Sequence, residues 1–120
     1  MSEMLKRFDA LTKLQDGWLD GEGIAPDAGQ MALVAQKFAA YYPKHAPLPV
    51  IAPTPQGNIL LEWNLPGYPT VDIFLNESIA QFHCLAGDAT EVAEVARDFS
   101  LTDDNAWKQF FVFLSEQIKH

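Results

Sequence analysis

The chain has 120 residues, of which 48% are hydrophobic and 20% are charged, a composition typical of one folded domain and unlike that of a disordered chain. Sixteen acidic residues against eight basic ones give a formal net charge of -8, which disfavours direct binding to nucleic acid or to an anionic membrane. The single cysteine excludes an internal disulfide and a multi-cysteine metal site.

The first third of the chain is expected to contain two helices. Apolar residues at spacings of three and four predict a helix over residues 3–15. A second helix is expected to begin near Pro26, because proline suits a first helical turn, and to end near Tyr42, just before Pro43.

The glycine-rich segment between these helices predicts a loop. A calcium loop counted from Asp16 would need an oxygen ligand at its third position, where Trp18 stands, and its twelfth position carries Asp27 in place of the usual glutamate. We therefore favour a turn closed by hydrogen bonds to Asp side chains, with Trp18 anchoring the loop to the core.

The middle of the chain predicts antiparallel strands. The proline-rich segment 47–53 suits only an edge strand, because each proline removes a backbone donor. Three runs that alternate apolar and polar residues follow at 58–64, 70–75 and 79–85, and their short connections predict a meander.

The last third is expected to be helical. Residues 88–91 resemble a capping box in front of a helix that reaches Phe99, and the segment 102–104 is expected to cap a final helix. The expected architecture is one α+β domain over residues 1–120, in the order α-α-β-β-β-β-α-α. Its antiparallel sheet of three to four strands would pack against the N- and C-terminal helices.

The outward face of the predicted meander carries the strongest candidate for chemistry. Glu62, Asp72 and His83 alternate away from the apolar set on three successive strands, so they could form an acid–base group or a weak metal site. A solvated sheet face explains the same pattern. Leu60 and Phe74 also point to that face, and a mixed apolar and acidic patch suits a protein partner or self-association.

Cys84 is expected to be a buried structural residue. A nucleophilic cysteine needs a base nearby, and His83 points to the opposite face of the strand. Known motifs for nucleotide binding, serine hydrolysis and zinc proteolysis are absent from the sequence, and we expect no catalytic residue, no metal ligand and no cofactor.

The segment 11–77 resembles a widespread group of small bacterial proteins with the pattern Gly-Trp-Asp-Gly, then Pro-x-Val-x-Pro-Thr-x-x-Gly, then Leu-Glu-Trp. The matching stretches are Gly17-Trp18-Leu19-Asp20-Gly21, which has an extra Leu19, Pro49-Val50-Ile51-Ala52-Pro53-Thr54-Pro55-Gln56-Gly57, which has Gln56 where Asp is usual, and Leu61-Glu62-Trp63. The function of that group is not known. The resemblance implies a fold relationship and a mobile-element or defence-gene context, and it assigns no catalytic residue.

These observations predict a non-catalytic, acidic protein-binding inhibitor that is encoded by a bacterium or its phage and located in the cytoplasm. It would be an antitoxin, an immunity protein or an anti-defence protein such as an anti-CRISPR, occupying a basic or nucleic-acid-binding surface of a partner protein. No signal peptide or membrane span is visible. The candidate contact residues are Asp16, Asp20, Glu22, Leu60, Glu62, Asp72, Phe74, His83, Asp103 and Asp104.

Two alternatives remain open at this stage. The first is a small enzyme or ligand-binding domain that uses the face with Glu62, Asp72 and His83. The second is a homodimer that pairs through an exposed sheet face.

Overall fold

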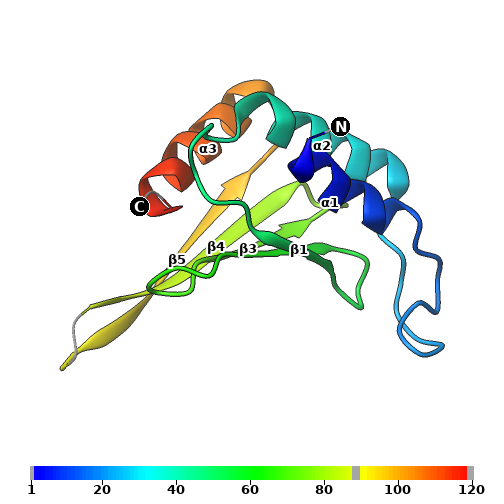
Figure 1. The fold of residues 1–120 in the computed structure, drawn as a ribbon, viewed down its shortest axis with the longest axis horizontal. Helices are drawn as coiled ribbons and strands as arrows, with labels where there is room; N and C mark the ends of the chain where they lie inside the picture. Colours follow the sequence, from blue (N-terminus) through cyan, green and yellow to red (C-terminus); the bar gives the residue numbers. More distant parts are fainter. Residues whose placement is uncertain (1, 88–89, 119–120) are drawn as a thin grey trace.

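The computed structural model describes residues 2–87 and 90–118, which form three helices and five strands (Figure 1). The α+β class predicted from the sequence is confirmed. The elements in chain order are α1 (Glu3–Thr12), α2 (Ala28–Tyr41), β1 (Val50–Pro53), β2 (Ile59–Glu62), β3 (Thr70–Phe74), β4 (Ile79–Gly87), β5 (Val92–Ser100) and α3 (Asp104–Ile118).

The five strands form one antiparallel sheet in the spatial order β1-β2-β3-β4-β5. Each strand pairs with the next one along the chain, as in the predicted meander. Val71 on the central strand β3 lies opposite Leu61 on β2 and Phe82 on β4. This register places the apolar residues of all three central strands on the same face.

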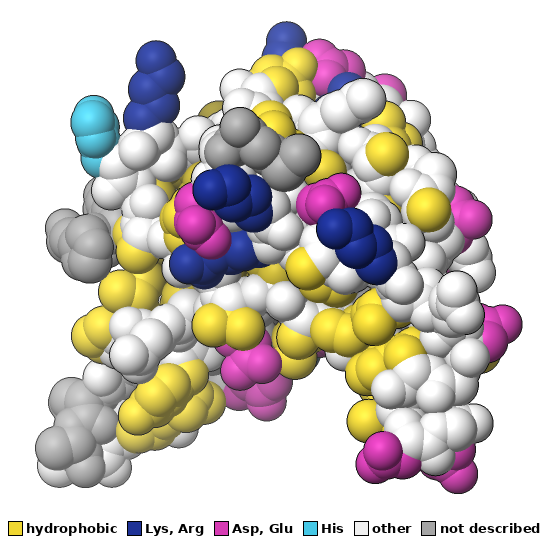
Figure 2. Space-filling model, turned by 45° about the vertical axis from the view of Figure 1, so that its right-hand side comes forward, with side chains coloured by type: hydrophobic (Ala, Val, Ile, Leu, Met, Phe, Trp, Pro, Cys, Tyr) yellow, Lys and Arg dark blue, Asp and Glu magenta, His cyan; other side chains and the backbone are white. Residues whose placement is uncertain are grey.

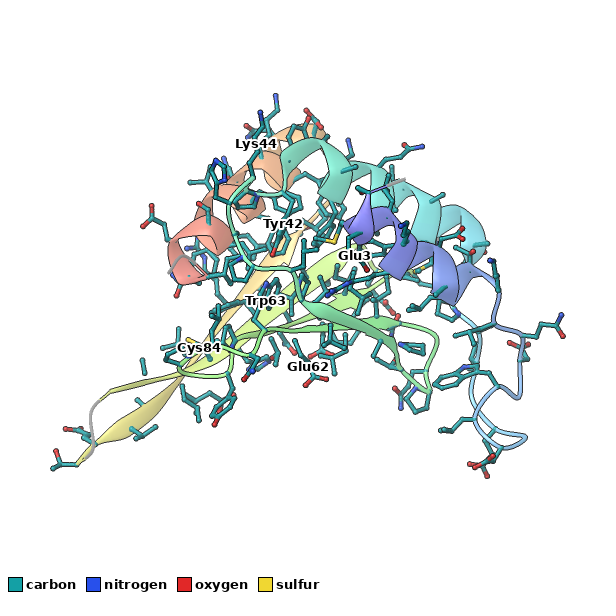
Figure 3. The ribbon with its side chains drawn as sticks, viewed as in Figure 1. Glu3, Tyr42, Lys44, Glu62, Trp63 and Cys84 are labelled. Atoms are coloured by element: carbon teal, nitrogen blue, oxygen red, sulfur yellow. The ribbon has the colours of Figure 1, made fainter. Side chains whose placement is uncertain are left out.

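The three helices lie on one side of the sheet and leave the other side uncovered (Figure 1). We call the covered side the inner face. The opposite side, the outer sheet face, carries the alternate residues of every strand. Figure 3 shows this division at two neighbouring residues: Trp63 points toward the helices, whereas Glu62 points away from them.

The core between helices and sheet is built around aromatic rings. Phe38 on α2 is fully buried, and its ring centroid lies 5.2 Å from that of Phe8 on α1 and 4.9 Å from that of Phe111 on α3. Phe38 therefore contacts both other helices, and edge-to-face geometry adds to the burial of apolar area.

The predicted helix over residues 88–99 is wrong. Residues Val92–Ser100 form strand β5, which pairs with all nine residues of β4. The sheet therefore has five strands instead of three to four, and the order is α-α-β-β-β-β-β-α. Two residues of the supposed capping box, 88 and 89, lie outside the described residues. Pairing with β4 outweighs local helical spacing, because it gives residues 92–100 cross-strand contacts along the whole length of β4.

The proline-rich segment forms the opposite edge of the sheet, as expected. Strand β1 pairs only with β2. Two side chains hold the segment in front of it: the Tyr42 hydroxyl donates to the Pro47 carbonyl, and the Arg7 guanidinium donates to the Pro49 carbonyl. Trp63 Nε1 donates to the Tyr42 oxygen at 2.9 Å, and burial raises the pKa of Tyr42 to about 12. This chain of contacts ties the edge to the core.

Within residues 2–87 and 90–118, no helix has the length and apolar character that crossing a membrane requires.

Candidate partner-binding surface

The outer sheet face is a mixed acidic and apolar surface. Among the strand residues that the structure describes, this face contains four carboxylates and no lysine or arginine. The carboxylates are those of Glu62, Asp72, Glu94 and Asp98, and the apolar side chains among them are Val50, Ala52, Leu60, Phe74, Ile79, Leu85, Val92 and Ala96.

The basic side chains lie on the other side of the molecule. Lys37 and Lys108 belong to helices α2 and α3, and Arg7 belongs to α1. Arg97 is the basic residue of the sheet, and its guanidinium lies on the inner face, 4.8 Å from the ring centroids of both Phe99 and Phe113. Figure 2 shows the dark blue side chains over the helical layer, with magenta groups beside them, and below this layer magenta and yellow groups without dark blue ones. The two layers thus differ in charge.

The strand register places Glu62, Asp72 and His83 on one face, as predicted, but it does not make them a compact cluster. Thr70 lies opposite both Glu62 and His83, so the two are separated by one strand, roughly 10 Å between their Cα positions. Asp72 lies opposite Leu60 on one side and Gln81 on the other.

His83 has a different acidic neighbour. Its Nδ1 lies 2.9 Å from Glu94 Oε1, a contact across the β4–β5 ladder. Sequence reasoning did not place Glu94 and Asp98 on the sheet face, because it assigned them to a helix. The signal was present: from Val92 to Ser100 one set of alternate residues reads Val, Glu, Ala, Asp, Ser, and this period of two is typical of a strand.

Metal binding finds no support in the described ranges 2–87 and 90–118, where no group of three or more His, Cys, Asp and Glu side chains could hold an ion. Cys84 lies on the inner face and is half-buried, less deeply placed than expected (Figure 3). Burial raises the pKa of its thiol, which keeps the sulfur protonated and poorly nucleophilic.

The glycine-rich loop forms a projection at the end of the molecule away from the β4–β5 hairpin (Figure 1). As expected, an Asp side chain closes it: Asp16 Oδ1 accepts a hydrogen bond from the Ala25 amide at 2.9 Å. Trp18 does not join the core as predicted; it stabilises the loop from within, because its Nε1 donates to the Ile24 carbonyl and its ring packs on Gly23.

The acidic residues of this loop face solvent. Asp20 and Glu22 are both exposed, near the tip. Figure 2 shows the underside of the molecule hollowed between two projections, the acidic loop at the right and the hairpin at the left. The outer sheet face forms the roof of this hollow.

The last two predicted contact residues have structural partners on the helical side. Asp103 Oδ1 accepts a hydrogen bond from the Ala106 amide at the start of α3. Asp104 accepts hydrogen bonds from Lys37 Nζ at 2.9 Å and from the Tyr41 hydroxyl at 2.7 Å, and these contacts lower its pKa to about 2. Both carboxylates stabilise the packing of α3, away from the outer sheet face.

No protein-family model, no curated protein and no solved structure matches this chain. The resemblance to the small bacterial group stays a prediction. A functional assignment therefore rests on the chemistry of the chain's own surfaces.

Proposed function

We propose that this protein is a non-catalytic binding protein whose outer sheet face contacts a partner protein with a basic surface. The observation that supports the proposal is the composition of that face: four carboxylates and a set of apolar side chains, with no lysine or arginine among its described residues and no helix over it.

Physical chemistry limits what can cover such a face. The apolar residues, such as Leu60, Phe74 and Ile79, favour burial in an interface. Burial of Glu62 and Asp72 without compensation would cost free energy, because each carboxylate would lose its hydration. A partner that supplies lysine or arginine offsets this cost and is also attracted at long range.

Several inhibitor functions use this kind of surface. Antitoxins, immunity proteins and anti-defence proteins such as anti-CRISPRs act by occupying a partner, and many partners of this kind have basic nucleic-acid-binding sites. An acidic face would compete with nucleic acid for such a site. We propose this class for the protein, in the cytoplasm of a bacterium or of a phage-infected cell.

The test begins by capturing the partner. A tagged chain is incubated with lysate of the source organism or its host, with and without nuclease, and captured proteins are identified by mass spectrometry. The captured protein is then purified, and its affinity is measured by calorimetry for the native chain and for two variants. Glu62→Gln/Asp72→Asn neutralises the outer sheet face, and Glu3→Gln/Asp9→Asn makes the same change in net charge on helix α1.

We expect the outer-face variant to weaken binding about tenfold, because two charge-assisted contacts are lost, and the α1 variant to change it little. Binding should also weaken as salt concentration rises. Equal effects of the two variants would contradict the proposal, as would the absence of any captured protein with a folded bait.

The alternative of an enzyme or ligand-binding domain has one observation in its favour, the contact between His83 and Glu94. A carboxylate beside an imidazole can set the orientation of the ring in acid–base chemistry. Substitution of His83 by alanine that abolishes a ligand or turnover signal, with partner affinity unchanged, would favour this alternative.

A further inference from the structure

Strand β5 is a long edge strand, and no second strand pairs with its free edge within the described residues 2–87 and 90–118. It has nine residues, pairs only with β4, and every side chain except that of Phe99 is exposed. In an antiparallel strand, alternate residues direct their N–H and C=O groups away from the neighbouring strand. β5 therefore presents a row of free backbone groups to solvent, a feature that natural sheets normally shorten, cover or interrupt.

The opposite edge shows such protection. β1 has four residues, ends at Pro53, and is preceded by Pro49, so few backbone donors are free along it. β5 contains neither a proline nor a glycine, and its residues pair without interruption with those of β4, from Gly87 to Ile79. The two edges of the same sheet thus differ in their capacity to accept another strand.

A groove lies beside the β5 edge on the inner side. It has a volume of about 510 Å³ and runs between Arg97 on β5 and one flank of α3. Its apolar part is formed by Phe113 and by Val112, which is 67% exposed, and its other lining residues on α3 are polar: Asn105, Lys108, Gln109 and Glu116. Side chains of an added strand that point to the inner side would enter this groove.

The outer side of the same edge is acidic. Glu94 and Asp98 stand two positions on either side of Ala96 and are both exposed. An added strand would therefore alternate, with basic side chains on the outer side next to these carboxylates and apolar side chains on the inner side above the groove.

We infer that β5 is a strand-addition site that binds an extended segment in which lysine or arginine alternates with apolar residues. This inference rests on the proposed function, because it says how the basic partner is held. Backbone hydrogen bonds along β5 supply affinity, and the two different sides of the edge select the alternating pattern.

A second copy of the chain fits this edge less well than a basic segment does. The outer side of its own β5 supplies Glu94 and Asp98 and no lysine or arginine, and antiparallel self-pairing centred on Ala96 would bring these two carboxylates opposite each other twice. Like charges directly opposite each other destabilise a pair of strands. The net charge of -8 on each copy adds repulsion.

The probe for this site is a fluorescent nine-residue peptide with lysine at odd positions and valine at even positions. Its binding is measured by anisotropy and compared with a peptide of the same composition that has its lysines in one block. We expect the alternating peptide to bind about tenfold more tightly, because only it places charge on one side and apolar groups on the other. In NMR spectra, the amides of β5 and of the α3 flank should shift, whereas those of α1 should not.

Backbone methylation separates strand addition from simple charge attraction. In one peptide the backbone nitrogens of the lysine residues are methylated, and in another those of the valine residues. Each peptide therefore loses the N–H donors that point to one of its two edges. Strand addition uses one edge, so one methylated peptide should lose binding and the other should keep it. Equal behaviour of the two peptides would overturn the inference.

Charge variants of the chain complete the test. Glu94→Lys/Asp98→Lys should weaken peptide binding about tenfold, whereas Glu3→Lys/Asp9→Lys, with the same change in net charge on helix α1, should not. Circular dichroism confirms that both variants fold. Comparable losses with the two variants would overturn the edge site.

Failure of strand addition and failure of the proposed function give different results. If the Glu62→Gln/Asp72→Asn variant weakens partner binding but the alternating peptide does not bind, the sheet face is the contact surface and strand addition is wrong. A concentration-dependent dimer, detected by sedimentation, whose formation shifts the β5 amides and which the peptide cannot dissociate would assign the edge to a second copy and would also overturn the inference.

Discussion

At the scale of single residues, hydrogen bonds decide which acidic groups are available to a partner. Asp104 and Glu62 are both acidic residues that the sequence offers as contact residues. In the structure, however, Asp104 accepts hydrogen bonds from Lys37 and Tyr41, which tie α2 to α3. The pKa of Asp104 falls from an ordinary 3.8 to about 2, mainly through the hydrogen bond from Lys37 and next through that from Tyr41. A carboxyl group with a lowered pKa stabilises the folded state only while it is ionised.

The pH dependence of stability tests this assignment. Because the folded pKa of Asp104 lies below its unfolded value, its contribution is present above about pH 4 and is lost as the pH falls toward 2. Asp104→Asn should therefore be less stable than the native chain at neutral pH, and the difference should shrink toward pH 2. Urea unfolding at a series of pH values measures it. A difference that stays constant down to pH 2 would contradict the role given to Asp104.

At the scale of elements, the β4–β5 hairpin depends on the loop that supports it. The Leu85 amide donates to the Gly67 carbonyl at 2.8 Å, so the loop between β2 and β3 meets β4 from the side. Gly67 has a φ of +83°, and a Cβ at this position would lie 2.5 Å from the Leu85 oxygen. Only glycine permits this close approach.

Gly67→Ala should destabilise the protein by about 2 kcal/mol or more, because a left-handed conformation and a backbone clash coincide. Gly29→Ala on helix α2 is the matched control. Its Cβ would have ordinary space and a helical backbone, so stability should stay the same or rise by up to about 1 kcal/mol. Chemical unfolding of both variants measures the contrast, and faster amide exchange at Leu85 would show the hairpin loosening. Equal stability of the two variants would show that the loop is not a support.

At the scale of the whole molecule, one aromatic cluster joins all three helices to the sheet. Phe38 is fully buried and contacts rings from α1 and α3, and the cluster continues from Phe111 through Phe110 to Phe99 on β5. With the helices gathered on one side, this cluster holds the layered structure together while the outer sheet face stays free.

Phe38→Ala should lower the free energy of unfolding by about 3–5 kcal/mol, because it removes a large buried side chain and leaves a cavity. That loss is a large fraction of the about 5–15 kcal/mol typical of a domain. Val112→Ala, at an exposed site on α3, should change it by no more than about 0.5 kcal/mol. Thermal and urea unfolding give both values. A small loss for Phe38→Ala would mean that the helices do not depend on a shared core.

The local pattern of the sequence determined most of the elements. Helical spacing identified α1, α2 and α3, and alternation identified the three strands that contain Ile59, Val71 and Phe82. These segments were predictable because the period of their apolar residues matches the geometry of one secondary structure only. The same alternation placed Leu60, Glu62, Asp72, Phe74 and His83 on one side of the sheet, as the register shows.

Only the tertiary structure decided whether residues 92–100 form a helix or a strand. Their apolar residues satisfy both a helical and a strand pattern, and the nine-residue pairing with β4 selects the strand. That choice adds Glu94 and Asp98 to the outer sheet face, creates the β5 edge, and turns Arg97 to the inner side. Local periodicity cannot report such features, because they depend on contacts between segments that the chain order alone leaves undetermined.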